Sequence, residues 1–262
     1  MTADSSPFGE PLPPKEFCQL LMNEVKEHHA RLHHPFYFAL YDGKLSLDEI
    51  RIWAKEAWGI FCMNVAINTA KLVRCQLSGI HDPDIQKEFV NIIMSEVGYV
   101  YFQGSPRPVA GHRALFLRFG EAIGISKEKL ERCESENDFL PTTVLARTGW
   151  LDIALRSGSI LEQVAATNCC NEFSNQLTGG RFLRSFKEHY GLKEDAIEFF
   201  AEHGIADTEH SNIGYELVER FATTKDMQIK VLKALRKGLG IWWALTDGVA
   251  RECEKLKNGV MD

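Results

Sequence analysis

Residues 199–210 read FFAEHGIADTEH, and their side-chain spacing is the most informative in the chain. No proline interrupts this stretch and apolar residues flank it, so we predict a helix. His203, Asp207 and His210 then stand at i, i+4 and i+7 and lie on one face over two turns. Two imidazoles and a carboxylate on one face suit a divalent transition metal. A solvated face with two chance histidines is the alternative, and the packed character of the flanking residues argues against it.

The composition of the 262-residue chain is ordinary for a soluble globular protein. Hydrophobic residues make up 45% and charged residues 25%, and a net charge of −6 argues against a nucleic-acid partner. No apolar run approaches the length of about 18 residues that indicates a membrane span, and no secretory signal opens the chain. The seven cysteines form no CxxC pair, which favours a reduced, cytoplasmic protein.

Helical periodicity extends through almost the whole chain. Residues 1–14 hold four of the nine prolines and are predicted to form a flexible tail, and residues 15–262 are predicted to form a single helical domain. No segment shows the sustained two-residue alternation of a strand, so we expect no sheet. The fold class is therefore all-α, with about eight or more helices. The expected helices cover approximately residues 15–32, 46–77, 82–98, 112–123, a short stretch from 126, 141–156, 159–177, 181–189, 194–221 and 226–257.

Local signals define several helix boundaries. Ser46 and Glu49 form a capping box for the helix 46–77, whose length allows a kink. Pro83 at a first helical position follows Asp82. The pair Gly179-Gly180 is expected to break the helix that begins near residue 159. The stretch 99–111, rich in glycine and proline, is predicted to be a loop.

Further metal ligands can be sought outside the opening motif, because a dinuclear site needs carboxylates that bridge two ions. Glu96 lies near a helix end, and His112 opens the next helix. Glu172 lies among small apolar residues, where a carboxylate needs a partner. Taken alone, Glu96 also fits a surface carboxylate and His112 a helix-terminal residue. Together with the opening motif they make three carboxylates and three imidazoles, a donor set suited to Fe(II) and Mn(II).

Other side chains are weaker candidates for a role at this site. Asn168, Asn175 and Glu209 could orient the imidazoles, although simple surface or core polarity explains them equally well. The pair Trp242-Trp243 is interpreted as core packing or a subunit contact. The aromatic and sulfur side chains that we expect to shape a substrate pocket are Phe36, Phe61, Met63 and Phe173.

The order of the candidate ligands resembles that of the haem-oxygenase-like dimetal oxidases and oxygenases. That group lies in the superfamily of thiaminase-like proteins and pyrroloquinoline-quinone synthase. The order is Glu96, the helix HRALFLRFGEAIG from His112, then Glu172, then His-x3-Asp-x2-His from His203. The resemblance extends from about Phe17 to the last helix. It implies a haem-oxygenase-like bundle of about seven to eight core helices, in which all six candidates bind two Fe(II) ions, or one iron and one manganese.

The resemblance also implies an activity. The expected protein is a non-haem diiron oxidoreductase with dioxygen as co-substrate and a peroxo-diferric intermediate. It would oxidise or cleave a small amine- or carboxylate-bearing metabolite in a biosynthetic pathway. The resemblance is compatible with an external electron donor and a homodimer, and we expect no nucleic-acid or membrane partner. The alternatives are a metal-free oxidase similar to pyrroloquinoline-quinone synthase, a p-aminobenzoate synthase-like protein and a non-enzymatic helical interaction module.

The p-aminobenzoate synthases of this superfamily resemble the chain at residues 94–96 and 34–37. That resemblance implies that Tyr37 is catalytic and that a lysine lies on the Glu172 helix. The matching region, Gly179–Leu183, contains no lysine. The segment between Glu96 and His112 is also longer than in that group. These departures leave the substrate open.

Overall fold

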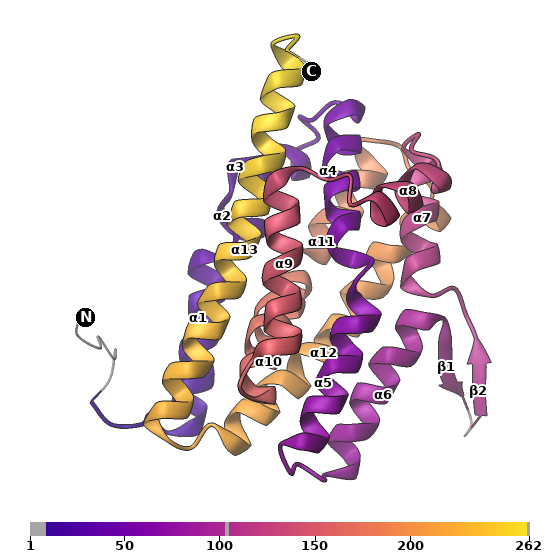
Figure 1. Ribbon diagram of the computed structural model, residues 1–262. Coiled ribbons are helices and arrows are strands. Elements are labelled where there is room, and N and C mark those ends of the chain that lie inside the picture. Colours follow the sequence, from indigo (N-terminus) through magenta and orange to yellow (C-terminus); the bar gives the residue numbers. More distant parts are fainter. Residues whose placement is uncertain (1–8, 103–104, 261–262) are drawn as a thin grey trace.

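Long helices lie side by side along one direction, and a β-hairpin projects from the edge of the bundle (Figure 1). This computed structural model describes residues 9–102 and 105–260, without the side chains of residues 101, 102, 105–107 and 204–210. The predicted all-α class is confirmed. Within the described residues, no helix combines the length and apolar character needed to cross a membrane.

Most of the chain between residues 14 and 257 is helical. The α-helices are α1 (Pro14–His28), α2 (Ala30–His33), α3 (Pro35–Tyr41), α4 (Leu47–Phe61), α5 (Asn64–Leu77), α6 (Pro83–Val97), α7 (His112–Ala122), α8 (Lys127–Glu136), α9 (Pro141–Arg156), α10 (Ile160–Ala166), α11 (Phe173–Glu188), α12 (Glu198–Phe221) and α13 (Lys225–Lys257). A π-helical turn, η1 (Thr167–Glu172), joins α10 to α11, and a 3-10 turn, η2 (Glu194–Ala196), precedes α12.

The longest helix, α13, runs along nearly the whole height of the bundle (Figure 1). It packs against α9 and α10, while α12 packs against α11 and η1. Leu12 exchanges two backbone hydrogen bonds with the Gln228 amide of α13, at 2.9 and 2.8 Å. Residues 1–8 of the predicted tail lie outside the described residues.

The first predicted helix, over residues 15–32, is interrupted at His29. α1 ends at His28, because His29 adopts an extended backbone with ψ of 133°. The His29 imidazole then accepts a hydrogen bond from the Arg31 N–H, and the His34 imidazole accepts one from the Phe36 N–H, each at 3.1 Å. Histidine side chains thus cap α2 and α3 in place of the usual Ser, Thr or Asp. The break gives Arg31 its own short turn of helix.

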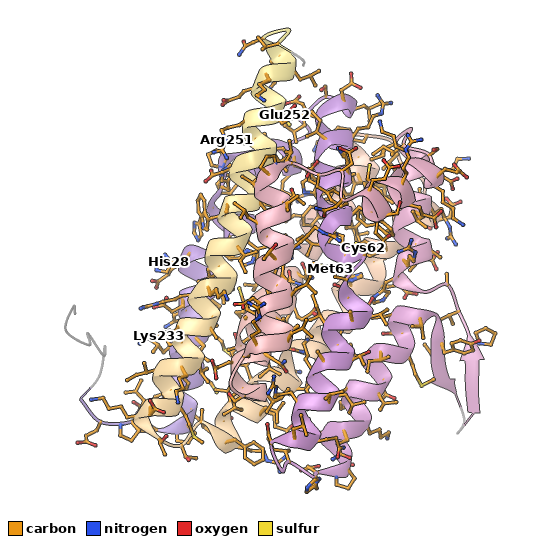
Figure 2. All side chains as sticks on the ribbon, viewed as in Figure 1. His28, Cys62, Met63, Lys233, Arg251 and Glu252 are labelled. Atoms are coloured by element: carbon orange, nitrogen blue, oxygen red, sulfur yellow. The ribbon has the colours of Figure 1, made fainter. Side chains whose placement is uncertain are left out.

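The predicted helix over residues 46–77 is two helices. The Ser46–Glu49 capping box is confirmed at the start of α4. α4 ends at Phe61 and α5 begins at Asn64, with Cys62 and Met63 at the junction in the middle of the bundle (Figure 2). The Arg147 guanidinium donates to the Gly59 carbonyl near this break. Side-chain donors of this kind satisfy backbone carbonyls that lose their helical hydrogen bonds at a break.

The predicted break at Gly179-Gly180 is wrong. α11 continues through both glycines to Glu188. A glycine inside a helix costs only about 1 kcal/mol relative to alanine. Phe182 and Phe186 are buried on the same helix, and burial of two such rings outweighs that cost. The irregular part of this region is instead η1, which ends at Glu172.

The expectation of no sheet is also wrong. β1 (Tyr99–Phe102) pairs antiparallel with β2 (Ser105–Pro108), with Tyr99 opposite Pro108, in the stretch predicted to be a loop. Four-residue strands are too short to show sustained alternation. Prolines are tolerated in β2 because both strands of a two-stranded hairpin are edge strands. The hairpin joins α6 to α7.

Candidate metal centre

Gly98 and Gly111 flank the hairpin and form its neck, where the two ends of the hairpin lie close together. Gly98 has φ of +92°, which only glycine adopts easily. A Cβ on Gly111 would lie 2.8 Å from the Glu96 carbonyl oxygen and 2.8 Å from the Gly98 nitrogen. The two backbones therefore approach as closely as glycine permits. The last turn of α6 and the first residue of α7 become neighbours, and these carry Glu96 and His112.

Glu96 and His112 form a buried pair. Glu96 Oε2 lies 3.1 Å from His112 Nδ1, and both residues are at most 7% exposed. His112 Nδ1 is a buried atom that makes no well-aligned hydrogen bond to a described residue. Two ligands that bind one metal at about 2.0–2.2 Å and at a right angle lie about 3 Å apart. The pair therefore has the separation of adjacent ligands on one metal ion.

The charge state of His112 reflects this acidic surrounding. Burial disfavours the charged imidazole and by itself lowers the pKa of His112. The Glu96 carboxylate outweighs burial and, with Glu202 and Glu172 farther out, raises the pKa of His112. A divalent cation would satisfy the same carboxylates.

His203 of α12 stacks beside His112, with ring centroids 4.3 Å apart. His203 Nδ1 lies 2.7 Å from the Phe199 carbonyl oxygen one turn earlier. A carbonyl oxygen only accepts, so Nδ1 carries a proton and donates it to this hydrogen bond. This arrangement is typical of metal-binding histidines, whose second ring nitrogen donates to a carbonyl or carboxylate.

The other oxygen of Glu96 is held from α5. Asn64 Nδ2 donates to Glu96 Oε1 at 3.2 Å, and Asn68 Nδ2 lies 3.5 Å from the same oxygen. These amides orient the carboxylate so that Oε2 faces His112. Our sequence analysis did not identify either asparagine.

A buried lysine that our sequence analysis missed lies beside the carboxylates. Lys71 of α5 is 1% exposed, and its Nζ donates to Asn168 Oδ1 at 2.7 Å. Burial lowers the pKa of Lys71 to about 8, although Glu172 and Glu96 favour its charged form. The signal was present in the sequence, because Ile67, Lys71 and Cys75 share one buried face at i, i+4 and i+8.

Glu172 ends η1 and lines a small polar cavity, and its charge acts on both Lys71 and His112. π-Helical turns occur often at functional sites. The polar cavity has a volume of about 20 Å³. It is lined by Ile60, Asn64, Ile67, Asn68, Lys71, Trp150, Thr167, Asn171, Glu172 and Trp242.

Four of the six predicted ligands, Glu96, His112, Glu172 and His203, thus come from four separate elements to one region. The backbones of Asp207 and His210 continue α12 in the predicted helical phase, and their side chains lie outside the described residues. Among the side chains that are described, no three His, Cys, Asp or Glu residues form a group that could by itself hold a metal ion.

An aromatic cavity, also of about 20 Å³, adjoins His203. Its lining residues are Arg31, Trp53, Phe61, Asn175, Gly179, Phe182, Phe199, Phe200 and His203. Of the four predicted pocket residues only Phe61 lines it. Tyr37 is buried behind this wall, with its ring 6.0 Å from that of Phe182. Its catalytic role stays a prediction.

The residues predicted to orient the imidazoles have different positions. Asn168 accepts hydrogen bonds from Lys71 and, at 3.0 Å, from Thr167. Asn175 lines the aromatic cavity. The side chain of Glu209 lies outside the described residues. Trp242 is buried as predicted for core packing.

The residues present fit iron. Nδ1 of His112, the imidazole of His203 and the oriented Glu96 carboxylate are nitrogen and oxygen donors of the kind that Fe(II) prefers. Binding of a cation would also use the donors that are otherwise buried at a cost.

Comparisons with known proteins agree with this chemistry. The profile of a family described as iron-containing redox enzymes matches residues 55–243. The chain is 28% identical to a 4-aminobenzoate synthase of Nitrosomonas europaea, over 89% of this chain and 90% of that protein. It is 26% identical to a pyrroloquinoline-quinone synthase of Pseudomonas putida, over 93% of this chain and 90% of that protein.

Solved structures share the fold. A TenA homologue from Pseudomonas syringae superposes with a TM-score of 0.69 at 16% identity, covering 93% of this chain and 99% of that one. A protein from Shewanella denitrificans described as having a haem-oxygenase-like fold gives a TM-score of 0.63 at 15% identity, covering 94% of this chain and 93% of that one. The expected haem-oxygenase-like fold is confirmed.

Proposed function

The chain belongs to the iron-containing redox enzyme family, and from that premise we propose that it is a dioxygen-dependent, non-haem diiron oxidoreductase. Its proposed ligands are Glu96, His112, Glu172, His203, Asp207 and His210. When bound, the two irons would supply the electrons and the coordination sites for dioxygen reduction. An external donor would return electrons after each turnover.

One observation carries the proposal. Glu96 Oε2 and His112 Nδ1 lie 3.1 Å apart in a buried site, yet His112 Nδ1 has no hydrogen-bond partner among the described residues. A structural ion pair would align for a hydrogen bond, because an unmet buried donor costs about 1–3 kcal/mol. A shared metal ion explains both the short separation and the missing hydrogen bond.

The surrounding residues hold the site in place. Asn64 fixes the orientation of Glu96, and the Phe199 carbonyl fixes the tautomer of His203. Lys71 supplies positive charge beside Glu96 and Glu172. The rings of Phe61 and Phe199 pack near His203 and exclude water from its cavity side, where reactive species need protection from solvent.

The proposed substrate is a small metabolite that carries an amine or a carboxylate. The compound in the name of the Nitrosomonas relative, 4-aminobenzoate, carries both groups. Aromatic walls beside a histidine suit the apolar part of such a molecule.

Anaerobic reconstitution with Fe(II) tests the function. We expect about two irons per chain by elemental analysis, and consumption of dioxygen on exposure to air. His112→Ala and His203→Ala should each lose bound iron, since each removes a ligand. His81→Ala is the matched control, because His81 is an exposed histidine before α6. It should bind iron like the wild type.

The outcome separates the alternatives. If the wild type binds no stoichiometric iron but still consumes dioxygen with an added substrate, a metal-free oxidase replaces the diiron proposal. If it neither binds iron nor consumes dioxygen with any amine or carboxylate tested, the interaction-module alternative is favoured.

A further inference from the structure

Arg31 is a buried cation in the wall of the aromatic cavity. The residue is 3% exposed and lies in the single turn of α2, between the two histidine-capped breaks. Its guanidinium stacks on the Trp242 ring, with Cζ 4.3 Å from the ring centroid. It lines the same cavity as His203.

Most N–H donors of the Arg31 guanidinium have no acceptor among the described residues. A guanidinium has five N–H donors. Among the described residues, its one acceptor is Ser174 Oγ, which Arg31 Nη1 approaches at 3.1 Å. Arg31 Nε is buried and has no hydrogen-bond partner there. No carboxylate among the described side chains, which leave out those of residues 204–210, forms an ion pair with Arg31.

Such a group is costly unless something binds it. A buried charge without a counter-ion is strongly unfavourable, and stacking on one tryptophan offsets only part of that cost. A purely structural role is better served by an apolar side chain of similar volume. A buried guanidinium with unsatisfied donors is suited to bind an anionic ligand.

We propose that Arg31 binds the carboxylate of the substrate and thereby determines that the substrate is a carboxylic acid. This inference rests on the proposed function, whose substrate it narrows from an amine or a carboxylate to a carboxylate. The guanidinium matches a carboxylate with two parallel hydrogen bonds, and the unpartnered Nε is one of the donors that this geometry uses.

The shape of the cavity supports a small monoanion. A volume of about 20 Å³ holds one or two water-sized groups, similar to a carboxylate. One guanidinium balances one negative charge, whereas a phosphate dianion would leave a charge unpaired. The carbon attached to the carboxylate would then face the rings of Phe182 and Phe199 and the imidazole of His203, which line the same cavity.

Calorimetric titration with formate and with its neutral isostere formamide, which match the size of the cavity, tests the assignment on the full-length protein. The titration uses protein without iron, so that formate cannot bind through the metal. Wild type should bind formate at least about tenfold more tightly than formamide, as expected for hydrogen bonds to a charged group. Arg31→Met should lose that preference, and Arg31→Lys should keep part of it.

Arg147→Met is the matched control. Arg147 also stacks on an aromatic ring, with Cζ 4.9 Å from the Phe139 centroid, and it donates to a carbonyl, but it does not line the aromatic cavity. It should leave the preference for formate over formamide unchanged. Equal binding of the two probes by wild type, or an unchanged preference in folded Arg31→Met, would overturn the assignment.

A second readout covers the case in which Arg31→Met does not fold. The Arg31 Nε–H resonance of wild type, identified by its absence in Arg31→Lys, should shift on addition of formate and not of formamide. No shift with formate overturns the assignment. Iron stoichiometry is measured separately: absence of stoichiometric iron with an intact preference for formate contradicts the diiron proposal and leaves the anion site standing.

Discussion

Two cavities of equal size, each about 20 Å³, are each lined by a buried cation, and the surroundings of the two cations differ. In the polar cavity, Lys71 lies beside Glu96, Glu172 and Asn168. In the aromatic cavity, Arg31 has one serine hydroxyl, one tryptophan face and no described carboxylate. The difference indicates that Lys71 compensates charges of the protein itself, whereas Arg31 has no counter-charge among the described side chains and is available for the charge of a ligand.

The largest effect should come from removing the cation of the polar cavity. Lys71→Met leaves the buried carboxylates without their neighbour, and breaking a buried charge pair costs about 3–5 kcal/mol. We expect a loss of about 3 kcal/mol in the free energy of unfolding of the metal-free protein, measured by urea denaturation. Added Fe(II) under anaerobic conditions should restore part of it. A loss below about 1 kcal/mol would remove the distinction between the cavities.

The pH dependence of stability is a second test of the burial of Lys71. The pKa of Lys71 is about 8 in the folded protein and 10.5 is its ordinary value. Between these values the unfolded chain binds more protons, so stability due to this group rises with pH, by up to about 1.4 kcal/mol per pH unit. The difference in unfolding free energy, wild type minus Lys71→Met, should rise from pH 8 to 10.5. A flat difference would contradict the burial of a charged lysine.

The neck of the hairpin allows a third comparison. Gly111→Ala places a Cβ 2.8 Å from the backbone at Glu96 and Gly98, and this overpacking should cost about 2 kcal/mol and weaken iron binding. Gly180→Ala is the control, because nothing lies within 4 Å of its Cβ, and it should gain up to about 1 kcal/mol from helix propensity. Equal effects on iron affinity would show that the neck does not position the ligands.

The smallest effect on stability is expected at Arg31. Arg31→Met removes a buried charge that forms no ion pair with a described side chain, and it keeps the side-chain volume, so the free energy of unfolding should change by less than about 1 kcal/mol. The same urea denaturation measures it beside Lys71→Met. A loss as large as that of Lys71→Met would mean that Arg31 is structural.

Sequence patterns located most helices and four predicted ligands that the structure brings into one region. The capping box at Ser46, the proline start of α6 and the long α12 are local features that depend on residues three or four apart. Sequence patterns did not locate the breaks at His29 and Cys62 or the continuation of α11 through Gly179. At these positions side-chain capping and packing override helix propensity.

By itself, the sequence determined the all-α class, and the order of its predicted ligands is the basis of the proposed dimetal site. Only the tertiary structure decided which charges are paired. Lys71 meets Asn168 across 97 residues, and Arg31 meets Ser174 across 143. Periodicity and capping act within one or two helical turns, whereas the surroundings of a buried charge depend on which distant helices pack beside it. The contrast between the two cavities is therefore a property of the packed bundle.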